Sequence, residues 1–98
     1  MSDNVTVIAH IRAKPGQEEQ VKGALLALCA PTRVEKGCIN YDLHQSHDDS
    51  ALFAFHENWV SKNDLDVHLQ SSHVQAFLKR IDELLAEAPK ITLWTRLG

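Results

Sequence analysis

Apolar and polar residues alternate along four stretches of the chain, and each alternation predicts a β-strand. The stretches cover residues 5–13, 39–46, 52–60 and 91–97. A period of two places successive side chains on opposite faces of a strand, so each segment can bury one face. In the second stretch we expect Ile39, Tyr41 and Leu43 to share a face.

A segment whose apolar residues have helical spacing lies between the first two predicted strands. Within residues 17–30 one helical face collects the apolar residues Val21, Leu25, Leu28 and Cys29. Pro31 disfavours helical geometry at Ala30, but the helix can kink there and continue toward Glu35.

A second helical region, split in two, follows the third strand. Ser61 and Asp64 form a near-capping box that starts a short helix, and Ser71 or Ser72 caps a longer one. The longer helix is predicted from an apolar stripe of Val74, Phe77, Leu78, Ile81, Leu84 and Leu85. We expect Pro89 to end it.

The element order β-α-β-β-α-β predicts an α+β fold of the ferredoxin-like type, formed by one domain over residues 1–98. Helices then cover one face of a four-stranded antiparallel sheet. Apolar residues fall on both faces of the strands, so the uncovered face should not be very polar. We therefore expect a homodimer that packs sheet against sheet, closing a dimeric α+β barrel, with Trp94 as a candidate for its interface.

Composition excludes several classes of partner. The net charge of −3 and the lack of a dense basic block argue against nucleic acid. No apolar run approaches the ~20 residues that span a bilayer. The N-terminal sequence MSDNVT has no features of a signal peptide, so we expect a cytoplasmic protein. Cys29 and Cys38 have no CxxC spacing and are expected to be free thiols.

Glu57 and His68 are the strongest candidates for chemistry. Glu57 shares its strand face with Phe55 and Trp59, where desolvation would raise its pKa and suit it to proton transfer. A salt bridge at a sheet end is the alternative. His68 shares an inward helix face with Leu65, so it can serve either as a base or as a hydrogen-bonded core histidine.

Other residues of the same region could shape a binding pocket. The candidates for its walls are Trp59, Phe53, Phe55 and Phe77, which could equally be plain core. Tyr41 can hydrogen-bond a ligand oxygen or place its hydroxyl in water. His73 can face the same cavity or cap its own helix.

The sequence offers no metal or cofactor motif. His44 and His47 would point to opposite faces of a strand, and His10 and His56 could meet across strands but lack a third ligand. HExxH, CxxC and glycine-rich phosphate-binding motifs are absent. We therefore expect neither a metal ion nor a cofactor.

Several segments together resemble the antibiotic biosynthesis monooxygenase (ABM) domain family, in particular the small bacterial proteins assigned as quinol monooxygenases. The segments are VTVIAHIRAKPGQEEQVKGAL, EKGCINYDLHQS, FAFHENW and VSKNDLDVHLQSSHVQAF. The resemblance extends over essentially the whole chain. It implies a dimeric α+β barrel with a hydrophobic cavity between each sheet and its helices.

The resemblance also implies a reaction. Characterised relatives oxidise hydroquinones or anthrones with O₂ and need no flavin, haem or metal. A base removes a phenolic proton, the anion reduces O₂ by one electron, and recombination gives a peroxide that collapses to the quinone. By this analogy His68 is the base, Glu57 its possible partner, the four aromatic residues are walls, and Tyr41 or His73 orients the ligand.

Two other functions remain open at this level. The first is an isomerase of a small polar metabolite, which clustered Arg and Lys in the pocket would favour. The second is a non-catalytic dimeric module that binds small molecules, which a cavity filled by side chains would favour.

Overall fold

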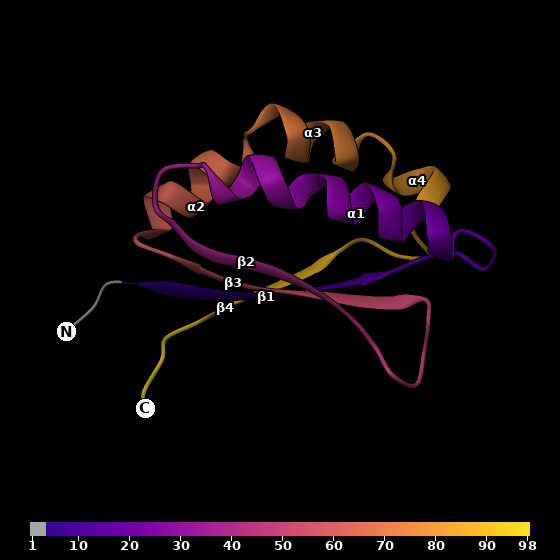
Figure 1. Ribbon diagram of the computed structural model, residues 1–98, viewed down its shortest axis with the longest axis horizontal. Coiled ribbons are helices and arrows are strands. Elements are labelled where there is room, and N and C mark those ends of the chain that lie inside the picture. The colour runs from indigo at the N-terminus through magenta and orange to yellow at the C-terminus, as the bar shows by residue number, and fades with distance from the viewer. Residues whose placement is uncertain (1–3) are drawn as a thin grey trace.

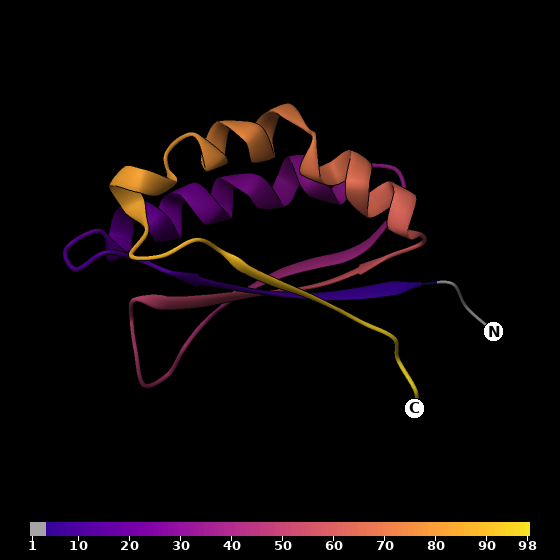
Figure 2. The ribbon, with the colours of Figure 1, turned by 180° about the vertical axis from the view of Figure 1, so that it is seen from behind.

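A computed structural model describes residues 4–98 and shows a four-stranded antiparallel sheet covered on one face by helices (Figure 1). The elements are β1 (Val5–Arg12), α1 (Glu18–Arg33), β2 (Cys38–Gln45), β3 (Leu52–Trp59), α2 (Lys62–Leu69), α3 (Ser72–Leu78), α4 (Ile81–Leu84) and β4 (Lys90–Trp94). The strand order is β2-β3-β1-β4. The view from behind shows the helices on the same side of the sheet, which confirms the predicted α+β arrangement (Figure 2). Residues 1–3 lie outside the described residues. They belong to the N-terminal sequence MSDNVT, for which we expected no signal peptide.

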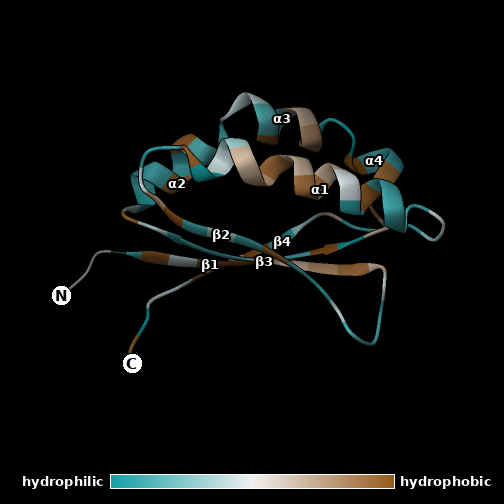
Figure 3. Ribbon diagram, viewed as in Figure 1, coloured by the Kyte–Doolittle hydropathy of each residue, from teal (hydrophilic) through white to brown (hydrophobic). Residues whose placement is uncertain are grey.

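Strand register explains why one face of the sheet is so apolar. In the pairing of β1 with β3, Ala9 lies opposite Phe55 and Ile11 lies opposite Phe53. Because the two strands are in this register, the apolar sets of both point toward the helices. Trp59 on the same face is completely buried. Figure 3 shows hydrophobic stretches in β1 and in the first half of β3, and hydrophobic and hydrophilic residues alternating along α1.

The outer face of the sheet carries both polar and apolar side chains. Its centre carries Thr6, whose hydroxyl donates to Asn58 over 2.6 Å, and Asn58 in turn donates to Asn40 over 2.8 Å. The apolar contribution comes from side chains such as Ile8, which is half-buried, and Trp94, which is exposed. Apolar side chains therefore occur on both faces of the sheet, as expected, although those of β1 and β3 are more numerous on the helix side.

An irregularity at the start of β2 corrects one predicted strand face. The register of β2 against β3 shifts between Cys38 and Asn40, so Ile39 falls out of the regular alternation. Ile39 is 51% exposed, whereas Tyr41 is buried. The prediction that Ile39 and Tyr41 share a face was therefore wrong, because alternation assumes a strand without a bulge.

The helix starts were predicted well, and α1 continues through Pro31 to Arg33. The Ser61 hydroxyl accepts a hydrogen bond from the backbone N–H of Asp64 and caps α2. Ser71 caps α3 in the same way, through the N–H of Val74. Each cap satisfies a backbone donor that has no partner within its own helix.

The long second helix is interrupted, contrary to the prediction. Helix α3 ends at Leu78 and the short helix α4 begins at Ile81. The chain then becomes extended at Leu85, because its backbone bonds to the end of β1: Lys14 N–H donates to the Leu84 carbonyl, and Leu85 forms a bridge with Ala13.

The last strand is also shorter than predicted. Strand β4 ends at Trp94, and Leu97 beyond it is almost fully exposed. Among residues 4–98, no helix has the length and apolar character needed to cross a membrane.

Candidate functional site

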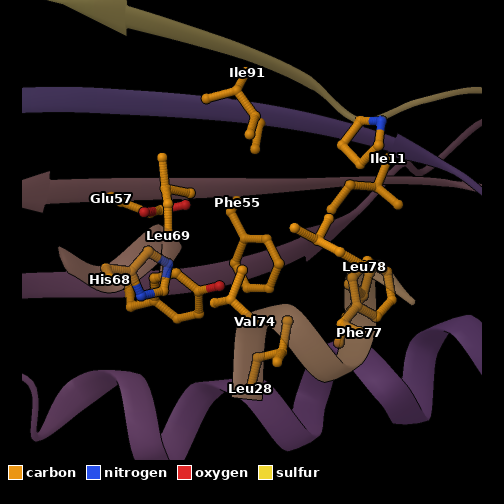
Figure 4. Close-up of a pocket in the computed structure, with 14 residues that line it drawn as sticks. Ile11, Leu28, Phe55, Glu57, His68, Leu69, Val74, Phe77, Leu78 and Ile91 are labelled. Atoms are coloured by element: carbon orange, nitrogen blue, oxygen red, sulfur yellow. The ribbon is translucent and has the colours of Figure 1, made fainter. Parts of the chain in front are cut away.

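A cavity lies between the helix-covered face of the sheet and helices α1, α2 and α3 (Figure 4). The volume of this cavity is about 80 Å³. One water molecule needs ~10–15 Å³ on the same measure, so the cavity has room for several. Its lining is formed by Ala9, Ile11, Leu25, Leu28, Tyr41, Phe55, Glu57, His68, Leu69, Val74, Phe77, Leu78, Pro89 and Ile91. The cavity is therefore an apolar chamber with three polar groups in its wall: the side chains of Tyr41, Glu57 and His68.

His68 lies in the last turn of α2, on the face that the apolar residue Leu65 also occupies. Its side chain is only 3% exposed. The Nδ1 atom lies 2.7 Å from the Oε2 atom of Glu35, which sits in the turn after α1. Because a carboxylate accepts hydrogen bonds and cannot donate them, Nδ1 carries the proton. The other ring nitrogen, Nε2, has no hydrogen-bond partner among residues 4–98, and the His68 side chain is part of the cavity lining.

The same oxygen of Glu35 also binds a second histidine. The Nε2 atom of His73, at the start of α3, lies 3.0 Å from Oε2 of Glu35. Two hydroxyls surround the same nitrogen, that of Thr32 at 3.1 Å and that of Ser71 at 3.3 Å. The result is a polar cluster that joins the end of α1 to α2 and α3.

Glycine at position 37 allows the turn that carries Glu35 to pack closely against α2. Gly37 has a positive φ of 82°, a conformation that residues with a Cβ avoid. A Cβ at this position would overlap the side chain of Asp64. Asp64 lies in the first turn of α2, so this contact holds the helix that carries His68 against the Glu35 turn.

Burial sets the protonation of His68. It lowers the pKa of the imidazole below its ordinary value, while the hydrogen bond and charge of Glu35 act in the opposite direction. A lowered pKa keeps the ring neutral near neutral pH. The neutral ring with its proton on Nδ1 can then accept a proton at Nε2.

Glu57 is the second unusual ionisable group of the cavity. Its side chain is buried, and its Oε1 atom accepts a hydrogen bond of 2.9 Å from the indole N–H of Trp59. Burial raises the pKa of Glu57 to about 7, against the opposing effect of the Trp59 hydrogen bond. The raised pKa agrees with the desolvation expected from the sequence. No hydrogen bond joins Glu57 to His68 among the described residues, so the carboxylate partner of His68 is Glu35 instead.

The predicted aromatic residues have two different positions. Phe55, Phe77 and Tyr41 line the cavity, and Tyr41 stacks on Phe55 with ring centroids 4.4 Å apart. Burial raises the pKa of the Tyr41 phenol above its ordinary value. Phe53 and Trp59 are buried in the core and are not among the lining residues.

Trp59 nonetheless acts on the site. Its ring packs on His68 with centroids 4.7 Å apart. His73 also stays outside the lining and acts through Glu35. Sequence reasoning missed Glu35 as a functional residue. The only local signal was its position before Gly37 in a turn, which does not reveal that His68, 33 residues further on, lies beside it.

Comparison with known proteins relates this geometry to a family. The family model described as "Antibiotic biosynthesis monooxygenase" matches residues 4–80. The chain is 34% identical over 93 residues to "Putative monooxygenase Rv0793" of Mycobacterium tuberculosis, an alignment that covers 95% of this chain and 91% of that protein. It is 28% identical over 94 residues to "Putative monooxygenase YcnE" of Bacillus subtilis, covering 96% and 98%.

A solved structure supports the same relationship. The crystal structure of PA3566 from Pseudomonas aeruginosa matches with a TM-score of 0.94 and 41% sequence identity, covering 100% of this chain and 98% of that one. The fold and the arrangement of the elements are thus shared over the full described chain.

Proposed function

The chain belongs to the antibiotic biosynthesis monooxygenase family, and from this premise we propose that it is a cofactor-independent monooxygenase that oxidises a quinol- or anthrone-like aromatic with O₂. The observation that carries the proposal is the environment of His68. A neutral imidazole, held by Glu35 at one nitrogen, lines an apolar cavity and has its other nitrogen without a partner among the described residues. Such a group can remove the hydroxyl proton of a phenol that is bound in the cavity and is no longer solvated by water.

The lining of the cavity favours a flat, weakly polar substrate. Phe55 and Phe77 offer ring faces and edges, and most other lining residues are aliphatic. Lysine and arginine are absent from the lining described above. A phosphorylated or strongly anionic metabolite would need such residues, and this argues against the isomerase.

The chemistry then follows in balanced steps. His68 Nε2 takes the phenolic proton of a quinol, or the enol proton of an anthrone. The resulting anion gives one electron to O₂, leaving a substrate radical and superoxide. Their recombination forms a carbon–oxygen bond, and the resulting peroxide anion takes the proton back from His68. The O–O bond of the hydroperoxide then breaks as the hydrogen on the same carbon is lost as a proton, which releases water and leaves a carbonyl group. The protein contributes desolvation, orientation and the proton acceptor.

Glu57 and Tyr41 complete the site in this proposal. Glu57, with a pKa of about 7, can hold or release a proton when the peroxide collapses. Tyr41 keeps its phenolic proton, because burial raises its pKa, and can donate it to a substrate oxygen. Trp59 holds Glu57 and His68 in place, through its hydrogen bond to Glu57 and its ring contact with His68.

Oxygen uptake by metal-free protein with a panel of hydroquinones and anthrones tests the proposal. We expect uptake well above autoxidation, and at least ~10²-fold slower turnover in His68→Ala, as for loss of a general base. His56→Ala is the matched control, because His56 is exposed on the outer face of the sheet. Turnover that survives in His68→Ala would exclude His68 as the base.

The absence of uptake across the whole panel would favour the binding module. In that case an aromatic ligand should still bind, and its binding can be followed by quenching of tryptophan fluorescence, because Trp59 packs on His68.

The homodimer is part of the same proposal. Trp94 is 55% exposed on the outer face of edge strand β4. Ile8 of the neighbouring strand β1 lies on the same face and is half-buried. A second copy packed on this face would cover Trp94 and Ile8 and close the dimeric barrel. Sedimentation equilibrium should give twice the chain mass of 11.0 kDa, and Trp94→Ser should shift the equilibrium toward the monomer. A wild-type mass of one chain at micromolar concentration would exclude the dimer.

A further inference from the structure

We propose that Glu35, His68 and His73 form a binding site for a divalent transition-metal ion, located on the side of His68 that faces away from the cavity. The three side chains each offer one donor atom, and these atoms all lie within 4.8 Å of one another. They come from the turn after α1, from α2 and from α3, and Glu35 is 33 positions before His68 in the sequence. Two imidazoles and one carboxylate form a donor set that suits Zn²⁺, Co²⁺ and similar ions.

The distances between the donor atoms are of the size that a shared ion requires. Oε2 of Glu35 lies 2.7 Å from Nδ1 of His68 and 3.0 Å from Nε2 of His73. Donors of a tetrahedral zinc site, with bonds of ~2.0–2.1 Å, are separated by roughly 3.3 Å. The two contacts of Glu35 must therefore lengthen by a few tenths of an ångström, and the two histidine nitrogens, which lie within 4.8 Å of each other, must reach the same spacing. Rotation of the Glu35 carboxylate and of the partly exposed His73 ring can supply both movements.

Access and charge also favour a cation at this place. The side chains of Glu35 and His73 are 16% and 21% exposed, so an ion can enter from solvent on their side. Glu35 supplies the negative charge, and Ser71 and Thr32 place hydroxyls within 3.3 Å of the His73 nitrogen. Neither Glu35 nor His73 lines the cavity, so the ion would not occupy the space for a substrate.

Metal binding would change what His68 presents to the cavity. A metal ion replaces the proton on Nδ1, and the neutral ring must then carry its proton on Nε2. A protonated Nε2 donates a hydrogen bond and cannot accept a proton. This consequence, unlike the metal site itself, rests on the proposed function. If that function holds, metal binding prevents His68 from acting as a base and does not block the cavity.

Isothermal titration calorimetry of metal-free protein with Zn²⁺, together with the absorption spectrum of the Co²⁺ complex, tests the site without any activity assay. We expect one ion per chain and the intense visible bands of tetrahedral Co²⁺. Glu35→Gln and His73→Ala should each weaken binding at least ~10-fold. Both variants should fold, because glutamine keeps the shape of glutamate and His73 is partly exposed.

His56→Ala is the control for adventitious binding by the exposed histidines of the outer face. Binding that is lost in His56→Ala but persists in His73→Ala would overturn the proposal, as would the absence of saturable binding to the wild type. Binding of one ion per chain that leaves turnover unchanged would support the metal site and would exclude its proposed effect on His68 as a base. Oxygen uptake by metal-free protein tests the proposed function separately.

Discussion

The Nδ1 atom of His68 lies 2.7 Å from Oε2 of Glu35, although the two residues are 33 positions apart in the chain. The hydrogen bond fixes the tautomer of a buried imidazole and its orientation. It also links the turn after α1 to the helix that borders the cavity. The properties of the site therefore depend on a residue that a substrate would not touch.

Glu35→Gln tests this dependence. Glutamine can still accept a hydrogen bond from Nδ1–H, but it lacks the charge that stabilises the protonated imidazole. We expect kcat to fall roughly 10- to 100-fold. KM should change little, because Glu35 does not line the cavity. Unchanged kcat, or a loss confined to KM, would contradict the positioning role. Nitrogen chemical shifts of His68 report the tautomer independently of activity.

Glu57→Gln tests the raised pKa of Glu57. Burial raises this pKa from 4.5 to about 7, so the folded state binds more protons than the unfolded state between these values. The Glu57 contribution should therefore lower the free energy of unfolding as pH rises through this window, by at most about 3 kcal/mol. Well below pH 4.5 and well above pH 7, where the group has the same protonation in both states, the contribution should be constant.

The matched measurement is urea unfolding of wild type and Glu57→Gln at several pH values. Glutamine retains an oxygen that can accept the Trp59 hydrogen bond, so the difference between the two proteins isolates the ionisation of Glu57. His68 has a lowered pKa and contributes with the opposite sign, but it is present in both proteins. A difference that does not vary between pH 4.5 and pH 7 would show that Glu57 has an ordinary pKa.

Gly37→Ala should destabilise the protein and disturb the site. Alanine is strained at a φ of 82°, and its Cβ would overlap Asp64. We expect a loss of about 2 kcal/mol or more, from the two effects together. Gly23→Ala is the control, because Gly23 lies within α1 and a Cβ there has open space. That variant should gain up to about 1 kcal/mol. Equal stability of the two variants in thermal unfolding would contradict the account of the Gly37 turn.

Val74→Phe should fill the cavity. Val74 is buried in α3 and lines the cavity. A phenyl group at this position takes up space that a ligand would need, at a cost of ~1–3 kcal/mol for overpacking. We expect affinity for an aromatic ligand to fall at least ~10-fold. Val67→Phe, on the exposed face of α2, should leave it unchanged. Undiminished affinity in Val74→Phe would place ligand binding elsewhere.

The faces of the strands were largely predictable, and the exceptions have local causes. Alternation correctly placed Phe53, Phe55 and Glu57 on one buried face of β3. It failed at Ile39, because a bulge changes the period within β2. It also could not predict that the apolar sides of β1 and β3 coincide, since this depends on the register between them.

Features that depend on neighbouring residues could be read from the sequence: the order of the strands, the serine caps of α2 and α3, and the inward position of His68 on its helix. The pairing of Glu35 with His68, and of Glu57 with Trp59, appeared only in the folded structure. These two groups of features differ in the sequence range of the interactions that produce them. Periodicity and capping act over a few residues, whereas the polar cluster forms only when sheet packing brings the ends of three separate helices together.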